Sequence, residues 1–406
     1  MSPTHYLALL LALLVLVAPA SAAPPDPPPI TEVLVGLPAG TSSLQVTALG
    51  GAIAAGAGLH AAGTLHYRPV VRVALDGRDL DTTLAELRAD PRVAYAEPNY
   101  PVYADAAPLD PALYTYQWGF RRAGGPAALG RIRALGHPDL TLAIVDTGTD
   151  DRHPDLAGRV DRGHDFVDGD NLPLDENGHG THTASIAGAA TFNDLGIAAP
   201  FPGRIMAVRV LNGVGIGTVG QVADGIDYAA RNGARVINLS LGYTAISETL
   251  HQAIRDAEAT GVVLVAAAGN SGNRTRHYPA AFDEVIAVSA WGFRETLTDF
   301  SSHYPGVELT APGEQIYAAY LHGGYQLLSG TSMASPLVAG TAAAVYAELL
   351  ALDPGLPPVD AGRCVRRILD ESAEDLFATG REEYTGFGMV RIDRALELTE
   401  TIQCVP

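Results

Sequence analysis

Five short apolar runs, rich in β-branched residues, alternate with longer segments of helical periodicity in the second part of the chain. The runs cover residues 142–145, 205–211, 236–239, 262–266 and 285–289, and the helical segments cover 179–190, 218–232, 247–260 and 333–350. Strands that are apolar on both faces and alternate with helices are typical of a mainly parallel sheet with helices on both faces. We therefore expect a doubly wound α/β domain, in which ligands bind beyond the carboxyl ends of the strands.

An earlier segment, residues 31–104, shows a different pattern. Its strand-like and helix-like stretches follow the order βαββαβ, at residues 32–37, 42–54, 63–67, 70–75, 80–89 and 93–97. This order predicts a small α+β unit with two helices on one face of an antiparallel sheet. Residues 23–30 before it are rich in proline, and residues 98–111 after it are typical of an exposed linker that a protease can cut.

Residues 1–22 are typical of a secretory signal peptide. An apolar run at 7–17 has the length of an h-region, and Ala20, Ser21 and Ala22 supply the small-residue cleavage pattern. An uncleaved membrane anchor is the alternative, but the run is shorter than the roughly 18 residues that a membrane span requires. We expect no later segment to be long and apolar enough to cross a membrane. The mature protein is therefore expected to be secreted, with no membrane contact after signal cleavage.

The 406-residue chain carries a formal charge of -19, which argues against nucleic acid as a partner. No excess of basic side chains is available to neutralise phosphates, whereas an acidic chain suits solubility or cation binding. The only two cysteines, Cys364 and Cys404, form an even pair in an exported chain. This favours one disulfide near the C-terminus, with two free buried thiols as the alternative.

Four polar residues stand where strands end or helices begin. Ser332, in LSGTSMASP, opens an Ala-rich helical segment, whose free N–H groups favour negative charge beside the hydroxyl. Asp146 and Asn270 follow apolar runs, and His179 opens a helical segment. Singly, each has an ordinary explanation: a helix cap for Ser332, turns for Asp146 and Asn270, and a metal-binding pair with His182 for His179. Together, these side chains can converge at one edge of a doubly wound sheet.

Five blocks of the sequence resemble the signature blocks of the subtilisin-like serine proteases, the subtilases or peptidase S8 family. The blocks are LAIVDTGTDDRHPDL (142–156), NGHGTHTASIAG (177–188), VINLSLG (236–242), AAAGN (266–270) and LSGTSMASP (328–336). They follow the family's order of Asp, His and Ser, and the likeness covers residues 113–398. The α+β unit, including its ending VAYAEPNY, resembles the family's I9-like inhibitory propeptide.

The resemblance implies a domain organisation and a role for each polar residue. We expect a signal peptide (1–22), a Pro-rich linker (23–30), an inhibitory propeptide domain (31–104), a linker and processing region (105–116) and a catalytic domain (117–406). Ser332 would attack the scissile carbonyl, and His179 would take the hydroxyl proton and pass it to the leaving amine. Asp146 would hold the imidazole, and Asn270 would donate to the oxyanion.

By the same resemblance, two stretches bind an extended peptide as strands on either side, and a third lines the pocket for the side chain before the cut. The residues concerned are Ser240, Leu241 and Gly242 on one edge, Gly215 and Gly217 on the facing strand, and Ala267, Ala268 and Gly269 at the pocket. A purely structural role for the glycines is the alternative. The small apolar walls imply a roomy hydrophobic pocket.

Two groups of oxygen-bearing side chains are candidates for structural calcium, although the chemistry itself is expected to need no cofactor. Asp165, Asp168 and Asp170 lie in a loop whose pattern resembles a calcium loop of heat-stable family members, and a solvated acidic loop is the alternative. Asp155 and Asn193, with nearby backbone carbonyls, resemble the family's commoner calcium site. The segment after that loop is shorter than usual, which makes the second candidate the weaker one.

The sequence as a whole predicts a secreted serine endopeptidase that works through a covalent acyl-enzyme and is made as an autoprocessed precursor. Its partners would be protein or peptide substrates and its own propeptide, and we expect a monomer. A noncatalytic peptide-binding scaffold of the same fold is the main alternative. Another serine hydrolase, such as an esterase, lacks support because no G-x-S-x-G elbow occurs at Ser332.

Overall fold

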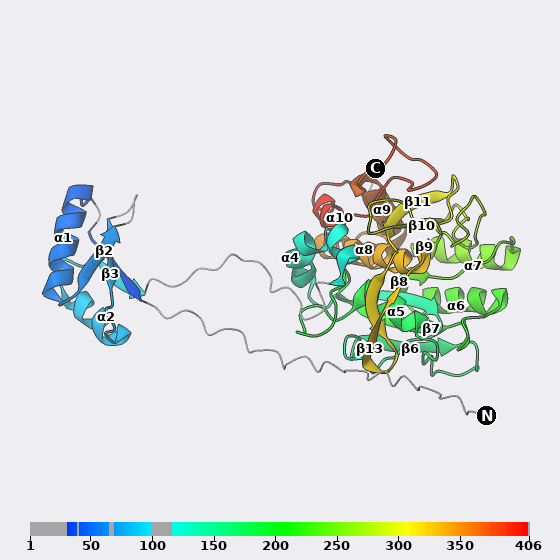
Figure 1. Cartoon of the computed structure of the whole chain (residues 1–406), viewed down its shortest axis with the longest axis horizontal. Helices are drawn as coiled ribbons and strands as arrows, with labels where there is room; N and C mark the ends of the chain where they lie inside the picture. Colours follow the sequence, from blue (N-terminus) through cyan, green and yellow to red (C-terminus); the bar gives the residue numbers. More distant parts are fainter. Residues whose placement is uncertain (1–30, 39, 65–68, 99–115, 405–406) are drawn as a thin grey trace, which may run out of the picture. The chain divides into compact units, whose positions relative to one another are not determined.

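The computed structural model describes residues 31–38, 40–64, 69–98 and 116–404, and the chain divides into two compact units (Figure 1). The first unit ends at Asp105 and the second begins at Ala106. The predicted signal peptide, the Pro-rich linker and residues 105–115 of the processing region lie outside the described residues.

The first unit has the predicted βαββαβ order, and its strands form an antiparallel sheet in the order β2-β3-β1-β4. Its core contains Val33, Val35, Val73 and Leu84. The second strand begins at His60 rather than at residue 63, since His60 and Ala61 already pair with β3. The sequence did not predict this start because alanine has a low strand propensity. The elements are β1 Glu32–Gly36, α1 Ser43–Gly56, β2 His60–Thr64, β3 Val70–Ala74, α2 Leu80–Ala89 and β4 Tyr95–Pro98.

The second unit is built on a seven-stranded parallel sheet in the order β11-β10-β9-β8-β5-β7-β6. The chain leaves β5 to build β6 and β7 on one side, and then crosses to build β8 to β11 on the other. This reversal creates a crevice outside the carboxyl ends of β5 and β8. The predicted doubly wound α/β fold is confirmed. The strands are β5 Thr141–Asp146, β6 Val160–Asp165, β7 Arg204–Arg209, β8 Ala234–Leu239, β9 Val263–Ala267, β10 Val285–Trp291 and β11 Val307–Pro312.

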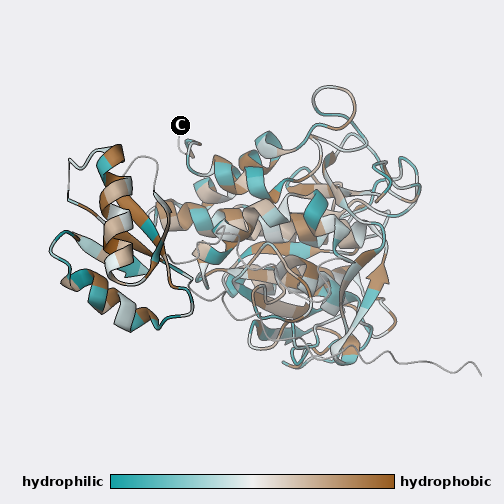
Figure 2. Cartoon of the chain, turned by 60° about the vertical axis from the view of Figure 1, so that its left-hand side comes forward, coloured by the Kyte–Doolittle hydropathy of each residue, from teal (hydrophilic) through white to brown (hydrophobic). Residues whose placement is uncertain are grey.

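Alternate side chains of the central strand β5 enter two separate cores, as the period of two in a strand requires. Leu142 and Ile144 belong to one apolar cluster, and Ala143 and Val145 belong to the other. Figure 2 shows brown apolar residues running through the packed helices and strands, with teal residues frequent on outer turns and loops. The second cluster is covered by α6 Val219–Arg231 and α7 Glu248–Glu258, and the first by α3 Trp118–Arg122, α4 Gly125–Leu135, α5 His179–Gly188, α8 Thr331–Leu352, α9 Pro358–Ser372 and α10 Ile392–Leu398.

Several strands of the second unit were not predicted. β6 reads VDRGHD, so it lacks the apolar run on which strand prediction depends. An antiparallel hairpin, β12 Ile316–Tyr320 and β13 Gly324–Leu328, is joined by a short 3-10 turn at Leu321–Gly323 and directly precedes the loop to α8. Its second strand, GYQLL, is also mixed in polarity.

Helix α8 runs through the core beside β8, β9 and β10 (Figure 1). By length and composition alone it could cross a membrane, so the expectation that no later segment has this character is wrong. Its most apolar window is 78% buried inside the unit, as in the core helix of a packed domain. Ala-rich composition allows this close packing, and the helix carries Ser332 in its first turn.

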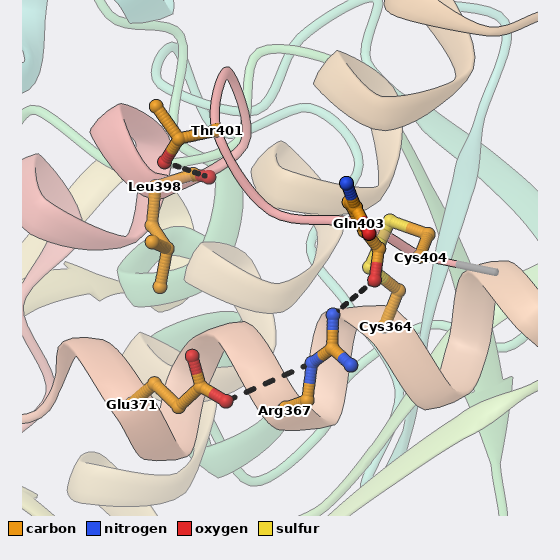
Figure 3. Close-up of a disulfide and its surroundings, with 7 residues drawn as sticks. All are labelled: Cys364, Arg367, Glu371, Leu398, Thr401, Gln403 and Cys404. Atoms are coloured by element: carbon orange, nitrogen blue, oxygen red, sulfur yellow. Dashed lines mark hydrogen bonds and ion pairs between the residues drawn. A yellow bond between two sulfur atoms is a disulfide. The ribbon is translucent and has the colours of Figure 1, made fainter. Parts of the chain in front are cut away.

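Cys364 of α9 and Cys404, which follows α10, form the predicted disulfide (Figure 3). On the same helix, Arg367 donates a hydrogen bond to the backbone carbonyl of Gln403 and lies 3.7 Å from the carboxylate of Glu371. The disulfide and this hydrogen bond together fix the end of the chain against α9. The two cysteines are separated by 40 residues, so the bridge closes a long loop in the unfolded chain.

Replacing both Cys364 and Cys404 by serine should lower the free energy of unfolding by about 4 kcal/mol in the chain-entropy model. Denaturant unfolding of the mature enzyme measures this change. Thr401→Ala is the matched control, because Thr401 lies in the same tail and donates only to the carbonyl of Leu398. An equal loss in both variants would show that loosening of the tail, and not the covalent bridge, causes the effect.

Candidate active site

Asp146 ends β5, and its carboxylate is fully buried at the carboxyl edge of the sheet. Its Oδ1 atom lies 2.7 Å from Nδ1 of His179, the first residue of α5. The same oxygen accepts a hydrogen bond from the N–H of Thr147 at 2.7 Å, and Oδ2 accepts one from the hydroxyl of Thr183 at 3.4 Å. A buried carboxylate is costly unless it is paired, so this contact fixes both the tautomer and the orientation of the imidazole.

The environment of His179 favours its protonated form. Burial alone would lower the pKa of His179, but the charge and hydrogen bond of Asp146, with a further contribution from Asp175, raise it above its ordinary value. The side chain keeps a quarter of its surface exposed. The imidazole can therefore exchange a proton with a bound molecule.

Asp175, which the sequence analysis missed, positions the start of α5. Its Oδ1 atom accepts hydrogen bonds from the N–H groups of Asn177 at 2.9 Å and Gly178 at 2.8 Å, and from the hydroxyl of Thr147 at 2.8 Å. Its Oδ2 atom accepts from both the N–H, at 2.8 Å, and the hydroxyl, at 2.6 Å, of Thr181. One carboxylate thus joins the first turn of α5 to the end of β5. A carboxylate a few residues before a helix start was the available sequence signal.

His182 does not form a metal-binding pair with His179. Its Nε2 atom lies 3.1 Å from the carbonyl of Ile316 and 3.0 Å from that of Gln326, so the ring joins α5 to the β12–β13 hairpin. Burial lowers the pKa of His182 to about 4, which keeps the ring neutral. Of the two histidines, His179 is the one hydrogen-bonded to Asp146.

Buried hydrogen bonds hold Ser332 against the end of β8. The hydroxyl of Ser240 donates to the carbonyl of Ser332 at 2.8 Å, and the amide of Asn238 donates to that hydroxyl at 3.0 Å. The hydroxyl of Ser335 donates to the amide oxygen of Asn238 at 2.7 Å. Asn238 and Ser335 were not predicted, although an asparagine within an apolar strand is a sequence signal for such a buried polar network.

The hydroxyl of Ser332 donates to the carbonyl of Ser240 at 3.2 Å, and within the described residues no hydrogen bond joins it to His179. Ser240, whose carbonyl accepts this hydrogen bond, nevertheless lines the same cavity as His179. A rotation about the Cα–Cβ bond of Ser332 would release its hydroxyl from Ser240. Hydrogen bonds between catalytic groups often tighten only when substrate binds.

Asn270 presents its amide N–H groups beside Ser332. Its Oδ1 atom accepts from the N–H of Thr331 at 2.9 Å and from the Thr331 hydroxyl at 3.0 Å, which leaves Nδ2 to donate elsewhere. A Cβ atom at Gly330 would lie 3.3 Å from Nδ2 of Asn270 and 3.6 Å from the backbone nitrogen of Ser332. Two nitrogen donors, Nδ2 of Asn270 and the backbone nitrogen of Ser332, therefore lie near one point beside Gly330. The second of them belongs to the first turn of α8, where N–H groups have no intrahelical partner.

A cavity of about 780 Å³ adjoins His179. Residues Ser240, Leu241 and Gly242 form one side of it, and the turn that contains Gly215 and Gly217 forms another. The predicted facing strand is not present, because residues 212–216 form a turn. The N–H of Gly215 donates to the carbonyl of Asn212, and the N–H of Asn212 donates to the carbonyl of Ile216. The apolar remainder of the lining is Leu211, Val214, Ile216, Val219, Val222, Tyr243 and Leu250.

The third predicted substrate-binding stretch does not line this cavity. Ala267 ends β9, and the side chain of Ala268 packs in a small cluster with Tyr304 and Val307. The N–H of Gly269 donates to the hydroxyl of Thr331 at 3.1 Å. This stretch therefore lies beside the start of α8, and all three of its residues are buried.

Arg209, not expected from the sequence, neutralises the predicted acidic calcium loop. Its guanidinium donates to Asp165 at 2.9 Å, to Asp168 at 2.8 Å and to Glu176 at 2.7 Å. Asp170 accepts from a backbone N–H two residues on. In the described part of the chain, no group of three or more His, Cys, Asp or Glu side chains is arranged to hold a metal ion. These carboxylates do not fit calcium in this arrangement, because the guanidinium of Arg209 already pairs with Asp165 and Asp168.

Asp155, in the weaker calcium candidate, is fully buried and takes part in no ion pair among the described residues. Its Oδ2 atom accepts from the N–H of Ile197 at 2.9 Å and from the hydroxyl of Tyr325 at 3.0 Å, and Oδ1 lies 3.5 Å from Nδ2 of Asn193. Burial raises the pKa of Asp155. Arg159 and His153 act on this carboxylate only through their charge, and its hydrogen-bond donors are neutral. It therefore fits a hard cation better than the loop in which Arg209 donates directly to the carboxylates.

The chain matches the model of the subtilase family over residues 138–388. It is 41% identical to thermitase of Thermoactinomyces vulgaris over 294 residues, which covers 71% of this chain and 99% of that protein. It is also 41% identical to a thermophilic serine proteinase of Bacillus sp. strain AK1 over 303 residues, 74% of this chain and 73% of that protein. An alkaline protease of Alkalihalobacillus alcalophilus is 38% identical over 278 residues, 68% of this chain and 69% of that protein. The chain therefore belongs to the subtilase family and is a serine endopeptidase.

Proposed function

We propose that Ser332 is the nucleophile, His179 the general base and acid, and Asp146 the group that orients the imidazole. The observation that carries this proposal is the 2.7 Å contact between the buried carboxylate of Asp146 and Nδ1 of His179, beside a cavity shared with Ser240. In the bound state the hydroxyl of Ser332 turns from the Ser240 carbonyl to Nε2 of His179. His179 takes its proton as the hydroxyl oxygen bonds to the substrate carbonyl carbon, and gives that proton to the leaving amine as the peptide bond breaks.

The two donors that face the space beside Gly330 are the proposed oxyanion hole. The side-chain amide of Asn270 and the backbone N–H of Ser332 would stabilise the negative oxygen of the tetrahedral intermediate. Thr331 supports this role because it engages Oδ1 of Asn270 and so directs the amide N–H groups outward. Water then hydrolyses the acyl-enzyme with His179 as the base.

The cavity beside His179 favours extended peptides with large apolar side chains. Ser240, Leu241 and Gly242 would pair with the peptide backbone as an added strand. On the opposite side, Val214 and Ile216 are 76% and 65% exposed, so a bound peptide has apolar surface to cover there. Gly215 and Gly217 would form the facing edge when substrate orders this turn.

The division of the chain into two compact units supports the proposal that it is made as a precursor. Residues 31–104 would guide folding and block the cleft, and would be cut away in the processing region 105–116, leaving a mature domain of residues 117–406. Residues 1–22 would direct secretion, and the mature enzyme would act as a monomer on protein or peptide substrates. The scaffold alternative is not favoured, because the named relatives are proteinases.

Replacing Ser332 by alanine should lower kcat for peptide hydrolysis about 10⁶-fold and leave the precursor at full length. Wild-type chain should shorten by loss of the segment that ends near residue 104, and a phosphonylating inhibitor should add its mass to the peptide containing Ser332. Ser329→Ala is the matched control, since Ser329 lies in the same loop and only accepts from the N–H of Gln315. Hydrolysis by the Ser332→Ala variant at the wild-type rate would contradict the assignment of the nucleophile.

In a plot of kcat/KM against pH, the midpoint of the acidic limb should lie above about 6.5, the ordinary pKa of histidine. His179 must be neutral to accept a proton, and its pKa is raised, so activity is lost as pH falls through that raised value. Asp175→Asn should move the limb to lower pH, because Asp175 adds to the raised pKa. Asp353→Asn, at the far end of the 22-residue helix α8, serves as the control and should leave the limb in place. An unchanged acidic limb in both variants would show that Asp175 does not raise the pKa of His179.

We propose that structural calcium is held at Asp155 and Asn193, and not at Asp165, Asp168 and Asp170. The support is the difference in charge pairing: Arg209 serves the acidic loop, whereas the Asp155 carboxylate has only neutral donors among the described residues. The ion would contribute charge neutralisation and hold the segment around Asn193. It would take no part in the chemical step.

A chelator should lower the thermal unfolding temperature of the mature enzyme, and excess calcium should restore it. Calcium at a hundredfold excess over Kd corresponds to about 2.7 kcal/mol of stability. Asp155→Asn should abolish the chelator effect, whereas Asp168→Asn should retain it. The opposite outcome would assign the ion to the acidic loop, and no chelator effect on the wild-type enzyme would refute both sites.

A further inference from the structure

Tyr320, the last residue of β12, packs on the two residues that precede His179. Its hydroxyl donates a hydrogen bond of 2.7 Å to the backbone carbonyl of Asn177. A Cβ atom at Gly178, where φ is +102°, would lie 2.2 Å from Cζ and 2.3 Å from Cε2 of the Tyr320 ring. The ring therefore lies directly on the backbone of Gly178, the N-cap residue of α5, and only glycine leaves room for it.

The peptide group between Asn177 and Gly178 is held at both of its ends. Its N–H, on Gly178, donates to the carboxylate of Asp175 at 2.8 Å. Its carbonyl, on Asn177, accepts from the hydroxyl of Tyr320. The side-chain oxygen of Asn177 in turn accepts from the N–H of His179 at 3.2 Å. Because Gly178 has no side chain that could cap α5, these contacts fix the direction in which the helix begins.

The β12–β13 hairpin that carries Tyr320 is attached to α5 at two further points. The N–H of Ala319 donates to the hydroxyl of Ser185 at 3.0 Å. The Nε2 atom of His182 lies 3.1 Å from a backbone carbonyl of β12 and 3.0 Å from one of β13. Tyr320 is therefore a fixed point of reference for the start of α5, because its own strand is held against the same helix.

The same hairpin leads directly into the loop that carries Ser332. The N–H of Gly330, in that loop, donates at 2.8 Å to the carbonyl of Gly313, which lies between β11 and β12. The two ends of the hairpin segment are thus joined just before α8. One hairpin contacts the starts of both α5 and α8, and Tyr320 is its contact with the residues before His179.

We propose that Tyr320 is a positioning residue, which orients the imidazole of His179 by holding the peptide group before it. The proposal rests on the proposed function, in which His179 moves the proton. The Tyr320 hydroxyl is neutral and bonds to backbone, so it acts on the direction of α5 and not on the charge of the imidazole. Without this hydrogen bond, the first turn of α5 would move and the contact between Asp146 and Nδ1 of His179 would weaken. A shift of about 1 Å in such a group can cost a hundredfold in rate.

Replacing Tyr320 by phenylalanine removes the hydroxyl and keeps the ring on Gly178. For a peptide p-nitroanilide, kcat should fall about threefold to tenfold, the worth of one neutral hydrogen bond, and KM should stay unchanged. The midpoint of the acidic limb should move to lower pH, because a weaker contact with Asp146 raises the pKa of His179 less. Titration with a phosphonylating inhibitor gives the concentration of active enzyme, so that kcat is expressed per active molecule.

Tyr317→Phe is the matched control. Tyr317 lies on the same strand and stacks on Tyr325, and among the described residues its hydroxyl makes no hydrogen bond. This variant should keep the kcat, the KM and the acidic limb of the wild-type enzyme. Thermal unfolding of both variants shows that the comparison is between folded enzymes.

Wild-type kcat and an unchanged acidic limb in the Tyr320→Phe enzyme would overturn the positioning role. Equal losses in both tyrosine variants would also overturn it, because a loosened hairpin would then be the cause. A raised KM with unchanged kcat would assign Tyr320 instead to the substrate turn, where Nδ2 of Asn177 donates to the carbonyl of Gly213 at 3.1 Å. Activity that survives Ser332→Ala would refute the proposed function itself, whatever the result for Tyr320.

Discussion

The contact between Asp146 and His179 is the interaction on which the rest of the site depends. A fully buried carboxylate is stable at the end of β5 only because an imidazole and backbone and hydroxyl donors satisfy it. The requirement works in both directions, since Asp146 fixes the ring and Nδ1–H of the ring donates to one oxygen of Asp146. Asp175 then ties the first turn of α5 to the end of β5, so the position of His179 follows from the position of the central strand.

A second set of polar contacts brings the start of α8 to the same edge. Asn238 and Ser240 at the end of β8 hold Ser332 and Ser335 through buried hydrogen bonds, and Thr331 holds Asn270. The side chains in this set are short, so they allow the helix start to approach the strand ends closely. Because the amide nitrogen and the amide oxygen of Asn238 are both paired, the network specifies one position for the start of α8.

The central strands, their helices and the four polar residues could be predicted from the sequence, because they depend on local periodicity and on motifs. β6 could not, since VDRGHD has no apolar run, and the facing strand at Gly215 proved to be a turn. The partners Arg209 and Asp175 join residues far apart in the chain, and such pairing follows from tertiary packing. The same holds for His182, whose carbonyl partners belong to a hairpin more than 130 residues away.

The two sides of the proposed substrate cavity differ in what holds them. Ser240 is locked to α8, whereas the turn from Asn212 to Ile216 carries exposed apolar side chains and is held by its own backbone hydrogen bonds. In the proposed function, reshaping that turn around a peptide would have a cost that the proposed catalytic groups, held by their own contacts, do not share. Binding energy from apolar residues of the substrate would therefore be used at the turn, and the proposed chemical step would need only the rotation of the Ser332 hydroxyl.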